Sequence, residues 1–176
     1  MINYRFDIAL ALSERGVFEN VSVQLVLHPS ENEDFLLTRL LAYGLEYEDG
    51  LRFAGGGVSD AEAPAVYSRA GDGRFAAWIE VGAPSPARLR RGVSAAERLA
   101  VYCHKNIDLF LDGVRKAGLP RAEQIPIYQV DSALLARLAP RLERRNRLSL
   151  TQSGGTLYLE LNGYSDQAEL VEHRLA

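Results

Sequence analysis

Cysteine and long apolar runs are scarce in this sequence of 176 residues. The single cysteine, Cys103, excludes an intrachain disulfide. No uninterrupted apolar run approaches the length of about twenty residues that spans a bilayer, and the N-terminus lacks the apolar core of a secretion signal. We therefore expect a cytoplasmic protein with no membrane contact.

The common short catalytic signatures are missing as well. The sequence contains no HExxH zinc motif, no Cys and His cluster and no nucleophile elbow. The run Gly55-Gly56-Gly57 is not a P-loop, because no Gly-Lys-Ser/Thr follows it. We expect no organic cofactor. A formal net charge of -3 argues against a generally basic protein that coats DNA, although local basic patches are compatible with it.

The length and the hydrophobic content of 47% predict one domain over residues 1–176 with a substantial core. Apolar residues alternate from Tyr4 to Leu12 and again from Val21 to Leu27, and Glu14-Arg15-Gly16 separates the two runs. This pattern predicts an N-terminal β-hairpin. The period then becomes helical, and Ser30 with Glu33 forms the pattern of a capping box.

The remaining segments alternate between helical and strand patterns, which indicates a mixed α+β class. A loop is expected over 49–64, helices over about 86–96 and 107–117, and a helix opened by Asp131 or Ser132. Strands are expected at 75–81, 99–103, near 125–130, at 148–151 and at 157–161. The residues predicted to be buried are Phe6, Ile8, Leu10, Val23, Leu25, Leu36, Leu40, Phe75, Ile79, Val101, Phe110 and Leu159.

Glu80 is the most informative candidate for a functional residue. It ends an apolar strand and shares one side of that strand with Trp78, while Ser85 and Pro86 open the next helix. A carboxylate is costly to desolvate unless a cation, a metal or hydrogen-bond donors hold it. The ordinary alternative is an exposed carboxylate or one that is paired with an arginine.

Several short runs agree in order and spacing with one protein family. These runs are His28-Pro29-Ser30-Glu31, Arg39-Leu40-Leu41-Ala42-Tyr43, Val58-Ser59-Asp60, Pro64, Trp78-Ile79-Glu80-Val81-Gly82 and Val101-Tyr102. With them the sequence resembles the YaeQ family, and the resemblance implies a PD-(D/E)XK nuclease-like fold, in which helices flank a mixed sheet.

The resemblance also implies a metal site for the hydrolysis of phosphodiesters. Glu80 would be the acid of the (D/E)XK element, Asp60, or failing it Glu62, would be its partner, and Glu31 would be an auxiliary acid. Mg²⁺ or Mn²⁺ would be the cofactor, because hard cations bind phosphate and carboxylate oxygens. The alternatives are a turn residue for Asp60 and a helix-terminal charge for Glu31.

The lysine of the motif is absent, since Gly82 stands in its place and the chain has only Lys105 and Lys116. The resemblance implies that a basic residue of the following helix replaces it. Arg91 matches best, and Arg88 and Arg90 would bind phosphate. An arginine can bind phosphate but cannot act as a base at neutral pH. The alternative for all three is a solvated helix face.

Two functions therefore remain open. One is a metal-dependent nuclease. The other is a non-catalytic module that binds nucleic acid or protein on a nuclease-like scaffold. The resemblance implies an aspartate directly after a proline, but Pro64 is followed by Ala65. Ala65, Gly82 and the acidic net charge favour the second function, and Glu80 with the arginine helix favours the first. We favour the second slightly. His104 is a further candidate, as an orienting group, and Lys105 could lie near the end of the sheet.

Overall fold

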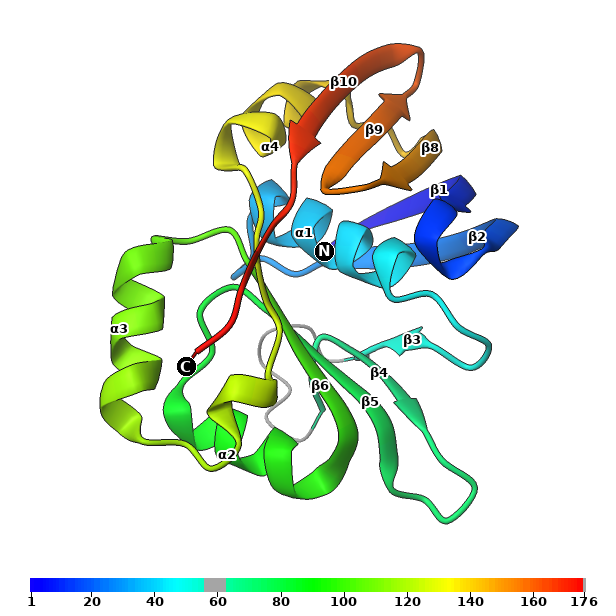
Figure 1. Cartoon of the computed structure of the whole chain (residues 1–176). Helices are drawn as coiled ribbons and strands as arrows, with labels where there is room; N and C mark the ends of the chain where they lie inside the picture. Colours follow the sequence, from blue (N-terminus) through cyan, green and yellow to red (C-terminus); the bar gives the residue numbers. More distant parts are fainter. Residues whose placement is uncertain (56–62, 176) are drawn as a thin grey trace.

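The computed structural model describes residues 1–55 and 63–175, and within them the chain forms two mixed β-sheets and four α-helices (Figure 1). The five-stranded sheet has the spatial order β10 (Tyr164–Glu169), β9 (Thr156–Leu161), β8 (Arg145–Ser153), β1 (Ile2–Leu12) and β2 (Val17–Leu27). The six-stranded sheet has the order β11 (Val171–His173), β7 (Ile127–Gln129), β6 (Ala96–Cys103), β5 (Phe75–Val81), β4 (Val66–Arg69) and β3 (Arg52–Phe53).

The helices divide the molecule into layers. The four are α1 (Glu33–Leu45), α2 (Pro86–Ala95), α3 (Ile107–Ala117) and α4 (Ser132–Leu138). One core cluster joins α1 and α4 to the inner faces of both sheets, and a second joins the opposite face of the six-stranded sheet to α2 and α3. Figure 1 shows α1 lying between the two sheets. None of the helices in the described part of the chain is long and apolar enough to cross a membrane.

The N-terminal hairpin is confirmed. Strands β1 and β2 pair antiparallel from Ile2 opposite Leu27 to Leu12 opposite Val17. The turn uses Gly16 in the left-handed region at φ 64°, where a side chain would be strained. The twelve residues predicted to be buried are buried with one exception, Val23, which is half-buried and packs against the core.

The predicted start of the first helix is wrong. Helix α1 begins at Glu33, and the side chain of Asn32 caps it by accepting the N–H of Phe35 at 2.9 Å. The Ser30 and Glu33 capping box does not form, because Asn32 is an equally strong capping residue and has the extended backbone that a cap needs. Glu31 therefore precedes the helix, and its Oε1 accepts the N–H of His28 at 2.8 Å.

The prediction of one sheet is also wrong, as is that of an unbroken loop over 49–64. The short strand β3 lies inside that segment and pairs with β4. At the C-terminus, β10 belongs to the five-stranded sheet and β11 to the six-stranded sheet, so the chain crosses from one sheet to the other (Figure 1). The sequence pattern missed these strands because β3 and β11 are very short and β10 is mostly polar.

The later helices follow their local signals. Ser85 caps α2 and Asn106 caps α3, each by accepting a backbone N–H from the first turn of the helix. Gly118 ends α3 in the left-handed region at φ 61°. Asp131, one of the two predicted caps, accepts the N–H of Ala133 and opens α4. Because α2 follows β5 in the chain after a short connection, the first turn of α2 lies next to the end of β5, the strand that carries Glu80.

Candidate functional site

The candidate site lies at the carboxyl ends of two parallel strands. Strands β5 and β6 run in parallel, with Glu80 opposite Val101, and the N–H of Gly82 donates to the carbonyl of Tyr102 at 2.9 Å. The residues that follow both strands therefore meet at one edge of the sheet (Figure 1). In sheets with parallel strands, ligands bind preferentially at this edge.

Glu80 is buried and paired with an arginine of α2. Its side chain is only 3% exposed, and Arg88 Nε donates a hydrogen bond to Glu80 Oε2. Arg88 Nη2 also donates to the carbonyl of Ala63 at 2.6 Å. The Ser85 cap places Arg88 in the first turn of α2, directly beside the end of β5. The arginine-paired alternative for Glu80 is therefore the arrangement that the structure shows.

Burial and Arg88 act on the Glu80 carboxyl in opposite directions. Burial raises the pKa of Glu80, and it outweighs the charge and the hydrogen bond of Arg88, which lower it. Trp78 and the backbone of Ala65 lower the pKa by smaller amounts. Trp78 Nε1 is buried, and it has no partner at regular hydrogen-bond geometry among the described residues.

The other predicted residues belong to α2, to the segment before α1 and to the residues that the structure does not describe. Arg90 and Arg91 are exposed on α2, and Arg90 Nη2 donates to the carbonyl of Ala117 at the end of α3, at 2.9 Å. Arg91 lines a surface pocket of about 520 Å³ together with Arg90. Glu31 lies before α1, and its Oε2 is buried without a partner in the described structure. Asp60 and Glu62 fall outside the described residues.

The described residues do not by themselves fit a Mg²⁺ or Mn²⁺ site. Within residues 1–55 and 63–175, no group of three or more His, Cys, Asp or Glu side chains is arranged to hold a metal. Mg²⁺ sites commonly use one or two carboxylates, and the Glu80 carboxylate is already bound by Arg88. The role of Asp60 as a second ligand remains a prediction.

Arg39 and His104 belong to a buried polar cluster beside α1, of which the sequence indicated only His104 as a functional candidate. Arg39 is 2% exposed, its Nη2 donates to the carbonyl of Val26 at 2.9 Å, and its guanidinium lies over the ring of Phe35 at 5.6 Å. Burial lowers the pKa of Arg39, and the charge of Glu31 opposes this. The signal in the sequence was an arginine within a run of apolar residues at helical spacing, a position that predicts a buried side chain.

His104 belongs to the same cluster. It is 7% exposed, its ring meets the ring of Phe35 edge-on at 6.5 Å, and a Cβ added at Gly82 would lie 3.8 Å from its Cε1. Neither ring nitrogen has a hydrogen-bond partner in the described part of the protein. Burial lowers the pKa of His104 to about 4, and the positive charge of Lys105 adds to this effect. The imidazole is therefore neutral at physiological pH.

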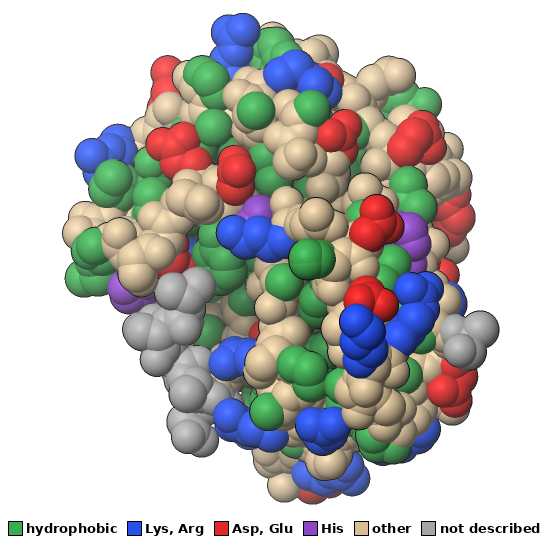
Figure 2. All heavy atoms as spheres, turned by 90° about the vertical axis from the view of Figure 1, so that its left-hand side faces the viewer, with side chains coloured by type: hydrophobic (Ala, Val, Ile, Leu, Met, Phe, Trp, Pro, Cys, Tyr) green, Lys and Arg blue, Asp and Glu red, His purple; other side chains and the backbone are tan. Residues whose placement is uncertain are grey.

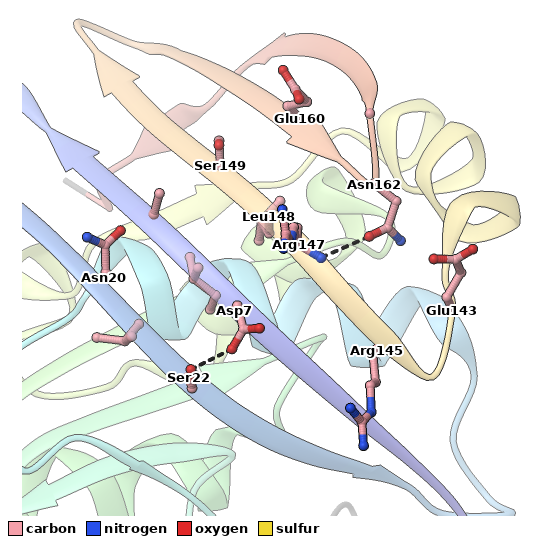
Figure 3. A pocket seen from close by; sticks show the side chains of 14 residues that line it. Asp7, Asn20, Ser22, Glu143, Arg145, Arg147, Leu148, Ser149, Glu160 and Asn162 are labelled. Atoms are coloured by element: carbon pink, nitrogen blue, oxygen red, sulfur yellow. Dashed lines mark hydrogen bonds between the residues drawn. The ribbon is translucent and has the colours of Figure 1, made fainter.

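A larger pocket lies elsewhere, on the outer face of the five-stranded sheet (Figure 3). It measures about 860 Å³, and Asp7 Oδ1 accepts a hydrogen bond from Ser22 at 2.5 Å on its floor. Side chains of both charges line it, among them Arg145, Arg147 and Glu160. Polar residues that alternate with core residues along each strand are typical of a sheet face turned to solvent.

The fold and the site define an α+β protein with a mixed sheet. The buried carboxylate of Glu80 is paired with an arginine and lies where the parallel strands β5 and β6 end. The sequence model of the YaeQ protein family matches residues 2–170. The chain therefore belongs to the YaeQ family.

Curated relatives and solved structures agree with this assignment. The uncharacterized YaeQ proteins of Escherichia coli (strain K12) and Salmonella typhi are 24% and 23% identical over 157 residues, which is 89% of this chain and 86% of each relative. The crystal structure of the Pseudomonas syringae YaeQ protein is 29% identical, with a TM-score of 0.88 over 97% of this chain and 94% of that one. The Xanthomonas axonopodis pv. citri YaeQ structure is 23% identical, with a TM-score of 0.90 over 99% and 98%.

Proposed function

We propose that this protein binds nucleic acid on a nuclease-like scaffold without hydrolysing it. The observation that carries the proposal is the contact between Arg88 and Glu80. This contact neutralises the carboxylate on which the predicted metal site depends. A cation at Glu80 would lie beside the positive guanidinium of Arg88, which opposes its binding, and displacement of Arg88 would break an ion pair of a buried carboxylate, which is costly.

Positive charge gathers outside this pair, although the chain as a whole is acidic. Figure 2 shows Lys and Arg side chains collected over the lower part of the molecule, in the region of α2 and α3. The fully exposed basic residues of α2, α3 and the segment after α3 are Arg90, Arg91, Arg115, Lys116 and Arg121, and we call them the α2–α3 basic surface. Lys116 also pairs with Asp112 at 2.9 Å. Exposed positive charge in such a patch supports binding to the phosphate backbone.

The binding proposal predicts salt-dependent association. A fluorescently labelled oligonucleotide should show increased anisotropy with the protein at low salt, and the affinity should fall as salt rises because counterions are released. The double variant Arg90→Glu with Arg91→Glu should bind at least about tenfold more weakly. The matched control is the double variant Arg145→Glu with Arg147→Glu, on the outer face of the five-stranded sheet. It should bind as the wild type does. Absence of binding at low salt would contradict the proposal.

Metal-dependent hydrolysis is the second candidate, because Glu80 lies at the carboxyl end of β5 in the position that the nuclease resemblance implies. The same oligonucleotides, incubated with Mg²⁺ or Mn²⁺, should remain intact if the protein only binds. Cleavage that needs the metal and disappears in Glu80→Ala, while Arg91→Lys retains it, would replace the binding proposal with the nuclease. Equal cleavage by the wild type and Glu80→Ala would indicate a contaminant.

A further inference from the structure

A second feature of α2 is a pocket formed by its C-terminal half and by the neighbouring strands β4 and β5. The pocket measures about 520 Å³, which is within the range of about 300–1,000 Å³ that ligand sites occupy. We call it the aromatic–arginine pocket. Among the described residues its lining includes three arginines and no carboxylate, and it consists of Arg69, Phe75, Trp78, Arg90, Arg91, Ser94 and Ala95.

Arg69 forms one wall of the pocket and is held in place there. Its guanidinium carbon lies 4.2 Å from the centre of the Phe75 ring, and Arg69 Nη1 donates to the carbonyl of Gly73 at 2.9 Å. The turn that carries Gly73 is itself closed by a backbone hydrogen bond of 3.0 Å from Gly73 to Ala70. Because Arg69 is exposed, its guanidinium presents a stacking surface to solvent.

The aromatic rings beneath Arg69 are rigid. Phe75 meets Trp78 edge-on, with ring centres 4.9 Å apart and planes at 73°. Trp78 is 2% exposed because α2 packs closely on it at Gly92, where an added Cβ would lie 3.1 Å from the indole. The stack of Trp78, Phe75 and Arg69 therefore has a fixed arrangement before any ligand binds.

Arg90 and Arg91 place positive charge beside this stack. Both line the pocket, and the hydrogen bond of Arg90 to Ala117 fixes the Arg90 guanidinium against the end of α3. A planar group on the Arg69 surface would thus have cationic groups within the same pocket. Nucleotides combine a planar base with a charged phosphate, and exposed bases stack on arginine planes and aromatic rings.

We propose that the aromatic–arginine pocket binds one unpaired nucleotide of a single-stranded nucleic acid, with its base on Arg69 and its phosphate at Arg90 and Arg91. This inference rests on the proposed function and specifies its ligand as single-stranded. A base inside a duplex is stacked on both sides, and it reaches such a pocket only if it is extruded at a cost.

Trp78 provides a direct measurement, because it is the only tryptophan of the chain. Its fluorescence therefore reports on the floor of this pocket. The experiment titrates the full-length protein with a single-stranded DNA of twelve nucleotides and with the matching duplex. Anisotropy of a labelled strand measures total binding, and Trp78 fluorescence with unlabelled strands measures occupancy of the pocket.

The single strand should bind about tenfold more tightly than the duplex and should change Trp78 fluorescence, since stacking on the pocket is lost in the duplex. Arg69→Gln should weaken single-strand binding about tenfold and leave duplex binding nearly unchanged. Arg69→Lys keeps the charge but removes the planar guanidinium, so it should lose the same preference. Arg145→Gln, a matched arginine on the other sheet, should have no effect. Far-UV circular dichroism confirms that each variant is folded.

The outcomes separate the two proposals. If anisotropy shows binding without single-strand preference, and Arg69→Gln and Arg69→Lys behave as Arg145→Gln does, the pocket inference is wrong and the proposed function stands. No binding of either DNA overturns both. Adenosine monophosphate serves as a separate probe. If it changes Trp78 fluorescence as strongly as the strand does at equal concentration, the pocket binds a free nucleotide and the assignment to a strand is wrong.

Discussion

Replacement of Arg88 by alanine is expected to lower the free energy of unfolding by about 3 kcal/mol at neutral pH. The variant leaves the Glu80 carboxylate 3% exposed and without its charged partner. Losses on breaking a buried ion pair run from about 3 to 5 kcal/mol, and the low end applies because Arg88 is itself 26% exposed. Urea denaturation at pH 7.5 measures the loss.

The stability lost in Arg88→Ala should be smaller at low pH than at neutral pH. Arg88 lowers the pKa of Glu80, so its removal raises that pKa further above the ordinary value. A carboxyl whose pKa is higher in the folded state is best accommodated when protonated, so the Arg88→Ala defect should shrink as the pH falls towards 5.

Two comparison variants sharpen this test. Glu80→Gln in the Arg88→Ala background removes the unpaired charge and should restore part of the stability. Arg90→Ala, on the exposed side of the same helix, loses only its hydrogen bond to Ala117 and should cost about 1 kcal/mol or less. An equal loss at both pH values, together with no rescue by Glu80→Gln, would show that Arg88 stabilises the fold through packing instead of charge.

His104 should make the protein less stable in mild acid. The pKa of His104 is lowered by burial from 6.5 to about 4, so the unfolded chain takes up a proton that the folded protein excludes. The stability is therefore intact above about pH 6.5 and is lost as the pH falls through the window to about 4. The shift corresponds to a loss of at most about 3 kcal/mol.

The substitution His104→Leu should remove this acid loss. Because both ring nitrogens lack partners in the described structure, an apolar side chain at this position should be nearly neutral at pH 7. His173→Leu is the control and should keep the acid slope, because His104 is still present. Chemical denaturation at pH 7, 6, 5 and 4 gives the profiles. An unchanged slope in His104→Leu would exclude His104 as its source.

Much of the local structure could be predicted because its signals are local. The alternation from Tyr4 to Leu12 fixed the inward face of β1, since successive side chains of a strand point to opposite sides. The Ser85 cap and Pro86 predicted the start of α2, and Gly118 predicted the end of α3. At the start of α1, two capping residues lay two positions apart, and the sequence pattern selected the wrong one.

The candidate site was predicted less completely. Glu80 was recognisable because a carboxylate at the end of an apolar strand needs a partner. Arg88 was predicted only to bind phosphate, and its pairing with Glu80 came from the structure. The pocket formed by Arg69 and Phe75 was missed, since β4 is short and its pairing to β5 places Arg69 opposite Phe75 only in the folded sheet. The packing of His104 against Phe35 of α1 was missed for a related reason: α1 and the end of β6 are far apart in sequence.

The sequence by itself determined the family, the hairpin, the helices and the Glu80 strand, because periodicity, caps and short motifs act within a few residues of one another. The tertiary structure decided which strands pair. A strand pattern specifies an inward face but not a neighbour, so the division into two sheets and the crossing from β10 to β11 follow only from contacts across the whole chain. The same contacts bury Glu80 beside Arg88. Burial makes the ionised carboxylate unfavourable unless a charged partner such as Arg88 stabilises it.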